Sequence, residues 1–184
     1  MSGNWSIARR RPALEARARI IQAIRHHFIQ EGFLEVETPL RIPAPAPESH
    51  IDAIPSRDWF LQTSPELCMK RLLAAGYERI FQISHCWRDS ERGSRHIPEF
   101  TMLEWYRANA DYRQLMADCE GLLVDLATAC GNRTSIMVHG KEVRLDLPWQ
   151  RLTVREAFAR FGGVTMDGAL ASDRFDEIMV EAIE

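Results

Sequence analysis

The chain has 184 residues, of which 46% are hydrophobic and 27% are charged, and its formal net charge is −3. This composition excludes a disordered chain, a collagen-like fibre and a disulfide-rich miniprotein, and the length predicts one globular domain. No run reaches the roughly 18–20 apolar residues of a membrane span. The segment 1–5 has no apolar stretch of signal-peptide type. We therefore expect a cytoplasmic protein without a membrane partner.

The cysteines and the charge pattern exclude further classes. The four cysteines form no C-x-x-C pair, which predicts free thiols in a reducing compartment and no metal site. Residues 1–30 contain six arginines and one acid, Glu15, so this stretch is basic although the whole chain is not. A large nucleic-acid surface is not predicted. The basic stretch could contact an acidic partner or form a solvated helix face.

The N-terminal third predicts a helix, a strand and a loop. Apolar residues at spacings of three and four indicate a helix that begins near Pro12 and ends before Gly32. These residues are Leu14, Ala18, Ile21, Ile24 and Phe28. Residues 33–38 alternate as a strand does, and Pro39 ends them. The three prolines of 43–47 predict an extended loop.

Residues 59–62 are typical of a short strand that leads into a helix. Ser64 can cap that helix and Pro65 can occupy its first turn. We expect the helix to end near Gly76.

Two strand-like segments, 79–87 and 99–107, are separated by the polar, glycine-containing segment 88–98. This arrangement predicts an antiparallel pair with a long charged connection.

A helix with one apolar face is predicted between Asp111 and Gly131. Asp111 and Gln114 have the spacing of a capping box. The apolar face consists of Leu115, Cys119, Leu122, Leu126 and Cys130.

The last third predicts a hairpin over 136–147 that turns at 139–140, and a helix that is capped by the 153–156 box and stops at 162–163. A final helix is expected over 173–184, without a stop signal, which indicates a truncated chain. Strands and helices with antiparallel connections predict an α+β fold in which helices flank an antiparallel sheet.

The strand–loop–strand segment contains the strongest group of chemical side chains. Arg88 ends one strand, and Phe100, Glu104 and Tyr106 share one face of the other. A guanidinium, a ring, a carboxylate and a phenol on one face could hold a small zwitterion beside a phosphorylated, flat-ringed ligand. Paired Arg and Glu on a surface strand are common, and the residues alone leave that alternative open.

Three segments in order resemble a known family. Gly32–Pro39 resembles motif 1 of class II aminoacyl-tRNA synthetases, with motif 1 spanning about 12–39. Residues 81–106, with Trp87-Arg88 and 98-PEFTMLE-104, resemble motif 2 of the lysine-specific branch, and 63-TSPEL-67 resembles its amino-acid-binding segment. The resemblance implies the N-terminal part, 1–184, of a class II catalytic domain without motif 3.

Within that branch, 104-EWYR-107 is most similar to the lysyltransferases that modify elongation factor P. Only about 30 residues precede motif 1, so we expect no anticodon-binding domain, and tRNA is the less expected acceptor. The resemblance implies that ATP and lysine or β-lysine form an aminoacyl-adenylate, which then acylates a lysine of elongation factor P. It also implies a homodimer through 12–39, with Leu14, Ile21, Ile24 and Phe28 packing on their own sheet as the alternative.

The resemblance assigns roles residue by residue. Arg88 is the expected catalytic residue, which holds the α-phosphate and the substrate carboxylate, and Phe100 stacks on adenine. Further ATP contacts are expected from Asp89, Ser90, Glu91, Arg92, Arg95 and His96. Substrate contacts are expected from Ser64, Pro65, Glu66, Glu104 and Tyr106, with both glutamates at the amino group. The Mg²⁺ ligands are expected in the missing C-terminal part.

Two positions depart from the family pattern. Ser90 stands where the family has the glutamate that reads adenine, with Glu91 one residue later, and Ile97 replaces an asparagine. With motif 3 also absent, we expect little adenylation by these residues alone. Two alternatives therefore stay open: a non-catalytic synthetase-like binding or dimerisation module, and a fragment of a class II lysyl-tRNA synthetase.

Overall fold

A computed structural model describes residues 7–131, 135–172 and 174–183. The chain divides into two compact units, one that ends at Leu145 and one that begins at Asp146. No helix within the described ranges is long and apolar enough to cross a membrane. The N-terminal segment 1–5 and the two ends of the predicted helix 173–184 lie outside the described residues.

Helix α2 (Arg11–Gln30) forms where the apolar spacing predicts it, with Pro12 in its first turn. Gly32 follows with φ +75°, a left-handed conformation that glycine adopts without strain, so the helix ends there. The C-terminal half of α2 places Ile24 and Phe28 in the core. Its N-terminal half is exposed, and Leu14 keeps 57% of its surface.

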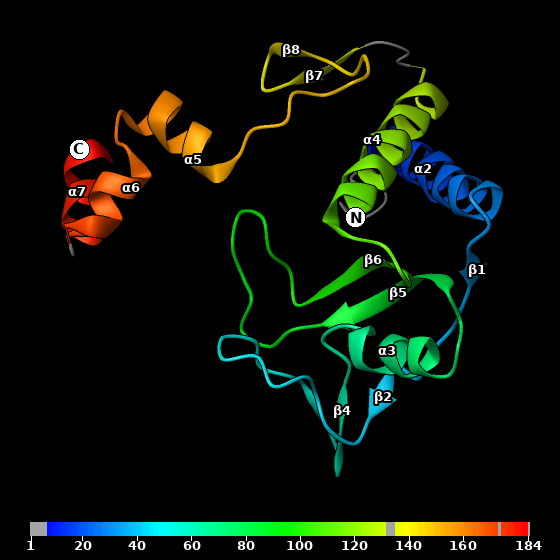
Figure 1. Cartoon of the computed structure of the whole chain (residues 1–184). Coiled ribbons are helices and arrows are strands. Elements are labelled where there is room, and N and C mark those ends of the chain that lie inside the picture. Colours follow the sequence, from blue (N-terminus) through cyan, green and yellow to red (C-terminus); the bar gives the residue numbers. More distant parts are fainter. Residues whose placement is uncertain (1–6, 132–134, 173, 184) are drawn as a thin grey trace. The chain divides into compact units, whose positions relative to one another are not determined.

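The main sheet has the order β1–β5–β6 (Figure 1). Strands β5 (Arg79–Trp87) and β6 (Glu99–Arg107) pair antiparallel over their whole lengths, as predicted. The strand predicted over 33–38 is much shorter: β1 (Leu34–Glu35) pairs parallel with the start of β5. After Val36, whose N–H donates to the Phe81 carbonyl, the chain leaves the sheet edge. The sheet is therefore mixed rather than purely antiparallel.

The alternation of β5 and β6 gives the sheet two different faces. On one face, Phe81 stacks on Phe28 of α2 at 4.9 Å between ring centroids, and Trp105 lies 5.3 Å from the same ring. The opposite face carries buried Ile80, Gln82, Ser84 and Cys86 beside Phe100, Met102, Glu104 and Tyr106. One face forms the aromatic core, and the other is free to carry polar chemistry.

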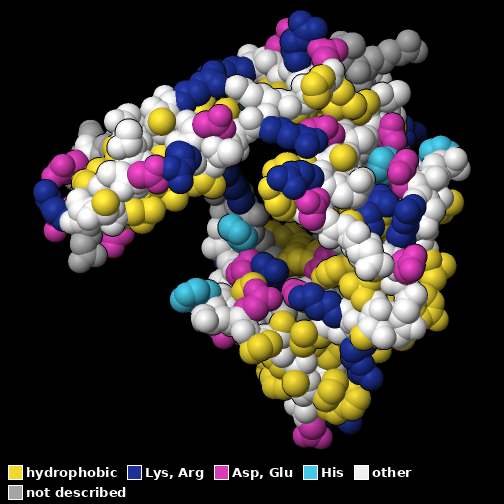
Figure 2. Space-filling model, viewed as in Figure 1, with side chains coloured by type: hydrophobic (Ala, Val, Ile, Leu, Met, Phe, Trp, Pro, Cys, Tyr) yellow, Lys and Arg dark blue, Asp and Glu magenta, His cyan; other side chains and the backbone are white. Residues whose placement is uncertain are grey.

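A small sheet and a short helix accompany the second face. Strands β2 (Arg41–Ile42), β4 (Trp59–Leu61) and β3 (Pro55–Ser56) form this sheet in that order. Figure 2 shows hydrophobic side chains gathered over β2 and β4. Helix α3 (Glu66–Ala74) follows and buries Met69, and Gly76 with φ +96° comes directly after its C-cap residue, Ala75.

Helix α4 (Tyr112–Ala129) packs against α2. The Asp111 carboxylate accepts from the backbone N–H groups of Arg113 and Gln114, so the predicted cap is present. The Gln114 side chain donates to Asp118 instead of completing the box. Leu122 is buried as expected, but Leu115 is 47% exposed, so the predicted apolar face is only partly core.

The Asp111 cap gives a stability prediction. Asp111→Ala removes the acceptor for two helix N–H groups and should lower the urea midpoint of unfolding. Asp111→Ser keeps a capping oxygen and should recover most of that loss. Urea unfolding followed by circular dichroism measures both values, and an unchanged midpoint for Asp111→Ala would contradict the prediction.

The hairpin of β7 (Ser135–Val138) and β8 (Lys141–Arg144) turns at His139 and Gly140, both with positive φ, as predicted. The C-terminal unit contains α5 (Val154–Ala157), the π-helical turn η1 (Phe158–Gly162), α6 (Met166–Ala171) and α7 (Phe175–Ile183). The capping box of Thr153 and Glu156 is complete. The sequence did not predict α6.

Candidate functional site

The phosphate end of the candidate site is a guanidinium above a ring. Arg88 follows the last residue of β5, and its guanidinium carbon lies 5.3 Å from the centroid of Phe100 on β6. Its Nε donates to the Thr63 carbonyl oxygen at 3.4 Å, and its backbone N–H donates to the Pro98 carbonyl. The cation is therefore held against the sheet face at the base of the 88–98 loop, where a phosphate could accept from the guanidinium.

The amine end is built around Glu104. Its Oε1 accepts a hydrogen bond from the Ser64 hydroxyl, and its Oε2 accepts from the Tyr106 hydroxyl at 2.9 Å. Ser64 Oγ in turn accepts from the Glu66 backbone N–H in the first turn of α3. Two neutral donors thus fix both oxygens and leave the carboxylate charge in place.

The electrostatics of this face follow from Glu104. Burial raises the pKa of the Cys86 thiol to about 11, with nearby Glu104 adding to the rise and Ser84 and Arg88 opposing it. The pKa of the Tyr106 phenol lies well above its usual value because of burial, its bond to Glu104 and the charges of Glu104 and Glu66. Tyr106 therefore keeps its phenolic proton at neutral pH and donates it in a hydrogen bond to Glu104.

A cavity of about 280 Å³ opens beside these groups. It is lined by Glu66, Leu103, Glu104, Trp105, Tyr106 and Leu115. Three of the five predicted substrate residues meet there, and the exposed Leu115 forms part of the wall. Glu66 also forms an ion pair with Lys70, one turn further along α3. Pro65 is buried and occupies the N-cap position of α3. The helix therefore begins at Glu66, one residue later than predicted, and Ser64 immediately precedes Pro65.

The loop residues are less closely gathered. Ser90 has φ +59°, a conformation that serine seldom adopts, and the next residue, Glu91, returns toward the site with Oε1 3.8 Å from Arg88 Nη1. The Asp89 N–H donates to the Asp52 carbonyl, and its carboxylate accepts from Ser90 N–H. Arg92, Arg95 and His96 lie exposed on the loop.

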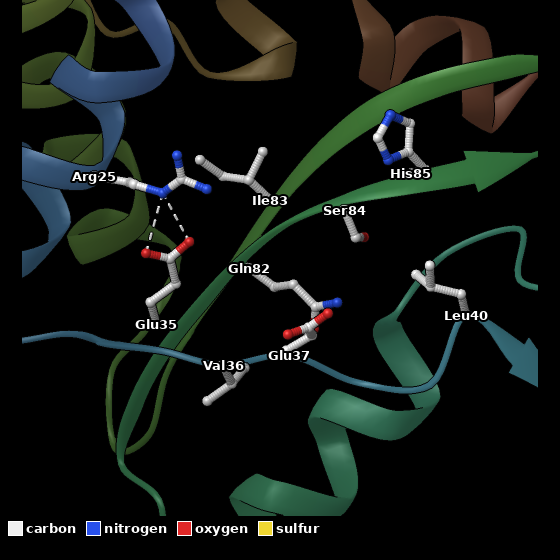
Figure 3. A pocket seen from close by; sticks show the side chains of 9 residues that line it. All are labelled: Arg25, Glu35, Val36, Glu37, Leu40, Gln82, Ile83, Ser84 and His85. Carbon is white, nitrogen blue, oxygen red and sulfur yellow. Dashed lines mark hydrogen bonds and ion pairs between the residues drawn. The ribbon is translucent and has the colours of Figure 1, made fainter.

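A second cavity was not predicted from the sequence. About 480 Å³ in volume, it lies beside β5 and is lined by Arg25, Glu35, Val36, Glu37, Leu40, Gln82, Ile83, Ser84 and His85 (Figure 3). On one side of this cavity, Arg25 Nε donates to both carboxylate oxygens of Glu35 (Figure 3). Gln82 Nε2 is buried there without a hydrogen-bond partner in the described structure. The residues that line this cavity come from three separate segments of the chain, so no single sequence motif indicates it.

Within the described ranges, no three His, Cys, Asp or Glu side chains come together as a metal site. The expected position of the Mg²⁺ ligands, outside these residues, stays a prediction.

Comparison with known proteins identifies the family. The model of the tRNA synthetases class II (D, K and N) matches residues 6–177. The chain belongs to this class II synthetase family. The chain is 36% identical over 173 residues to the lysine–tRNA ligase of Azoarcus sp. (strain BH72), covering 91% of this chain and 34% of that protein.

Other relatives of this class II synthetase chain carry the same name. The lysine–tRNA ligase of Chromohalobacter salexigens is 39% identical over 175 residues, which cover 88% of this chain and 35% of that protein. That of Thiobacillus denitrificans is 40% identical over 151 residues, which cover 79% and 30%. The chain spans about a third of the length of these curated relatives. The predicted class II synthetase family and the α+β fold are confirmed. The closer resemblance to the lysyltransferases of elongation factor P and the roles of individual site residues stay predictions.

Proposed function

We propose that this class II synthetase chain binds ATP and lysine for an ATP-dependent ligase reaction. The observation that supports this most strongly is that Arg88 and Phe100 share one sheet face with Glu104 and its two donors. Lysine or β-lysine attacks the α-phosphate through its carboxylate, pyrophosphate leaves, and an aminoacyl-adenylate forms. Lysine use by relatives of the same family supports the choice of amino acid.

In this proposal the side chains act by position and charge. Arg88 bridges the substrate carboxylate and the α-phosphate and stabilises the charge that develops during in-line attack. Phe100 stacks on adenine, and Glu91, beside Arg88, faces the same ligand. Asp89 and Ser90 shape the loop, and Arg92, Arg95 and His96 reach the outer phosphates when it closes over ATP.

The substrate amine lies at the other end of the face. Glu104 pairs with an ammonium group, while Ser64 and Tyr106 hold its two oxygens. Glu66 lines the same cavity, and Pro65 sets the start of α3 that positions Glu66. The adenylate then transfers its acyl group to an acceptor, with AMP as the leaving group.

We infer a lysine of elongation factor P as that acceptor, on the resemblance of 104-EWYR-107 to the lysyltransferases. The 3′ end of tRNA is the second candidate, and it is favoured by the relatives, which are named lysine–tRNA ligases. The four free cysteines suit a reducing compartment, and we place the reaction in the cytosol.

Label transfer tests the proposal. Radiolabelled lysine or β-lysine and ATP are incubated with the protein, elongation factor P and total tRNA, and each acceptor is isolated. Label on elongation factor P supports the first acceptor, and label on tRNA overturns it in favour of the second. Titration of lysine by isothermal calorimetry, with and without a non-hydrolysable ATP analogue, tests binding itself; no heat in either titration would overturn the proposed site.

We also propose a homodimer through the 12–39 segment. The C-terminal half of α2 packs into its own core, but Leu14 on the same apolar stripe stays exposed. Light scattering should therefore give about twice the 21.2 kDa chain mass, falling on dilution. A mass that stays at one chain over the whole concentration range would contradict the dimer. Leu14→Glu should lower the mass, whereas the exposed Leu170→Glu should not.

A further inference from the structure

The two acids on the amine wall differ in their counter-ions. Glu104 accepts hydrogen bonds only from the hydroxyls of Ser64 and Tyr106, and no Lys, Arg or His of the described chain forms an ion pair with it. Glu66 forms an ion pair with the ammonium of Lys70. Both carboxylates lie near enough to Tyr106 for their charges to raise its pKa. Glu104 thus offers an uncompensated negative charge, and Glu66 offers one that is already neutralised.

This difference matters for a substrate with two ammonium groups. An ammonium that reaches Glu104 gains an ion pair with no competitor. An ammonium that reaches Glu66 must share the carboxylate with Lys70 or displace it. Lys70 is one of only two lysines in the chain. It lies one helical turn after Glu66 on α3, so the helix holds the two side chains on the same face.

We propose that Lys70 is a specificity-determining residue. By neutralising Glu66, it limits the gain in binding affinity that the second ammonium of a diamino acid provides. This inference rests on the proposed lysine site and deepens it. Glu104 binds one ammonium of the substrate. The Lys70–Glu66 ion pair determines how much additional affinity the second ammonium contributes. Lys70 acts through Glu66 and contacts no reacting atom.

The size of the effect follows from the exposure of the pair. The Lys70 and Glu66 side chains keep 55% and 37% of their surface, so their attraction is strongly screened. Removing the competing ammonium should therefore change affinity for a diamine by about two- to fivefold. An amino acid whose only ammonium pairs with Glu104 should be unaffected, because Lys70 contacts Glu66 and not Glu104.

The test compares lysine with norleucine, which has the same chain length but lacks the terminal ammonium. Calorimetric titration of the whole chain gives both affinities for the wild type and for Lys70→Met, Lys70→Arg and the double variant Glu66→Gln/Lys70→Met. We expect Lys70→Met to bind lysine two- to fivefold more tightly with norleucine unchanged. Lys70→Arg should behave as the wild type, and the double variant should lose the gain. Circular dichroism of each variant reports folding.

The outcomes separate this inference from the proposed function. If the wild type does not prefer lysine to norleucine, both are overturned. If the wild type prefers lysine but Lys70→Met leaves the preference unchanged or lowers it, the role of Lys70 is overturned and the lysine site stands. An equal gain in Lys70→Arg would also overturn the role of Lys70, because it would show that the positive charge is not the cause.

Discussion

Replacing Arg88 with methionine should weaken ATP binding by about 10- to 100-fold. A hydrogen bond to a charged group contributes about 1.5–3 kcal/mol, and Arg88 is proposed to give such bonds to the α-phosphate. The guanidinium is fixed beforehand against Phe100 and the Thr63 carbonyl, so little freedom is lost when ATP binds. Arg88→Lys should recover only part of the affinity, because an ammonium lacks the planar fork of donors.

Arg95→Met is the matched control. Arg95 has the same side chain and lies in the same loop, but it is exposed and is proposed to reach only the outer phosphates, not the α-phosphate. We expect its effect on ATP affinity to be several times smaller than that of Arg88→Met. Isothermal calorimetry with a non-hydrolysable ATP analogue measures all three variants. Equal losses at positions 88 and 95 would mean that the loop attracts ATP by general charge, and would contradict the proposed role of Arg88.

Glu104→Gln should weaken lysine binding by at least about 30-fold. Removing one partner of a buried, hydrogen-bonded charge pair costs about 2–5 kcal/mol. The glutamine keeps the size of the side chain but places an amide NH₂ opposite the hydroxyl of Ser64 or Tyr106, both of which donate to Glu104. The loss therefore combines a missing charge with a disturbed donor arrangement.

Glu99→Gln provides the control for this variant. Glu99 lies on the same strand, but at its other end, opposite Trp87, and is exposed. Its lysine affinity should stay within about twofold of the wild type. Titration of lysine into both variants measures the difference, and urea unfolding shows whether Glu104→Gln is folded. A folded Glu104→Gln protein that binds lysine normally would remove Glu104 from the site.

The local signals in this sequence predict much of the fold because they act over a few residues. The spacing around Phe28, the Asp111 cap, the positive-φ turn at Gly140 and the box at Thr153 each fix an element whose bounds agree with the structure within a few residues. The long β5–β6 pair was also predictable, since two apolar segments flank one polar connection.

What the sequence could not predict depends on tertiary contacts. The short β1 ends because the chain leaves the edge of β5 after Val36, and alternation alone does not report such a departure. Leu115 fits an apolar helical stripe, yet its place on α4 exposes it beside the cavity with Glu104. The second cavity joins Arg25, Glu37 and His85 from distant segments, which no spacing rule connects.

The candidate site shows the same division. The common face of Phe100, Glu104 and Tyr106 follows from strand alternation, and the sequence predicts it. Lys70 and Glu66 have the i, i+4 spacing of a helical ion pair, so their pairing follows from the sequence once the helix is placed. The return of Glu91 toward Arg88 depends on the left-handed backbone of Ser90, which the sequence does not signal.

The hydroxyl of Ser64 has a consequence for mutagenesis. The same oxygen accepts from the first turn of α3 and donates to Glu104, so helix initiation and the orientation of the acid depend on one atom. Any substitution that removes this oxygen affects both the first turn of α3 and the binding of an amine by Glu104. Effects measured at Ser64 are therefore inseparable mixtures, and the site is better dissected through its neighbours on either side.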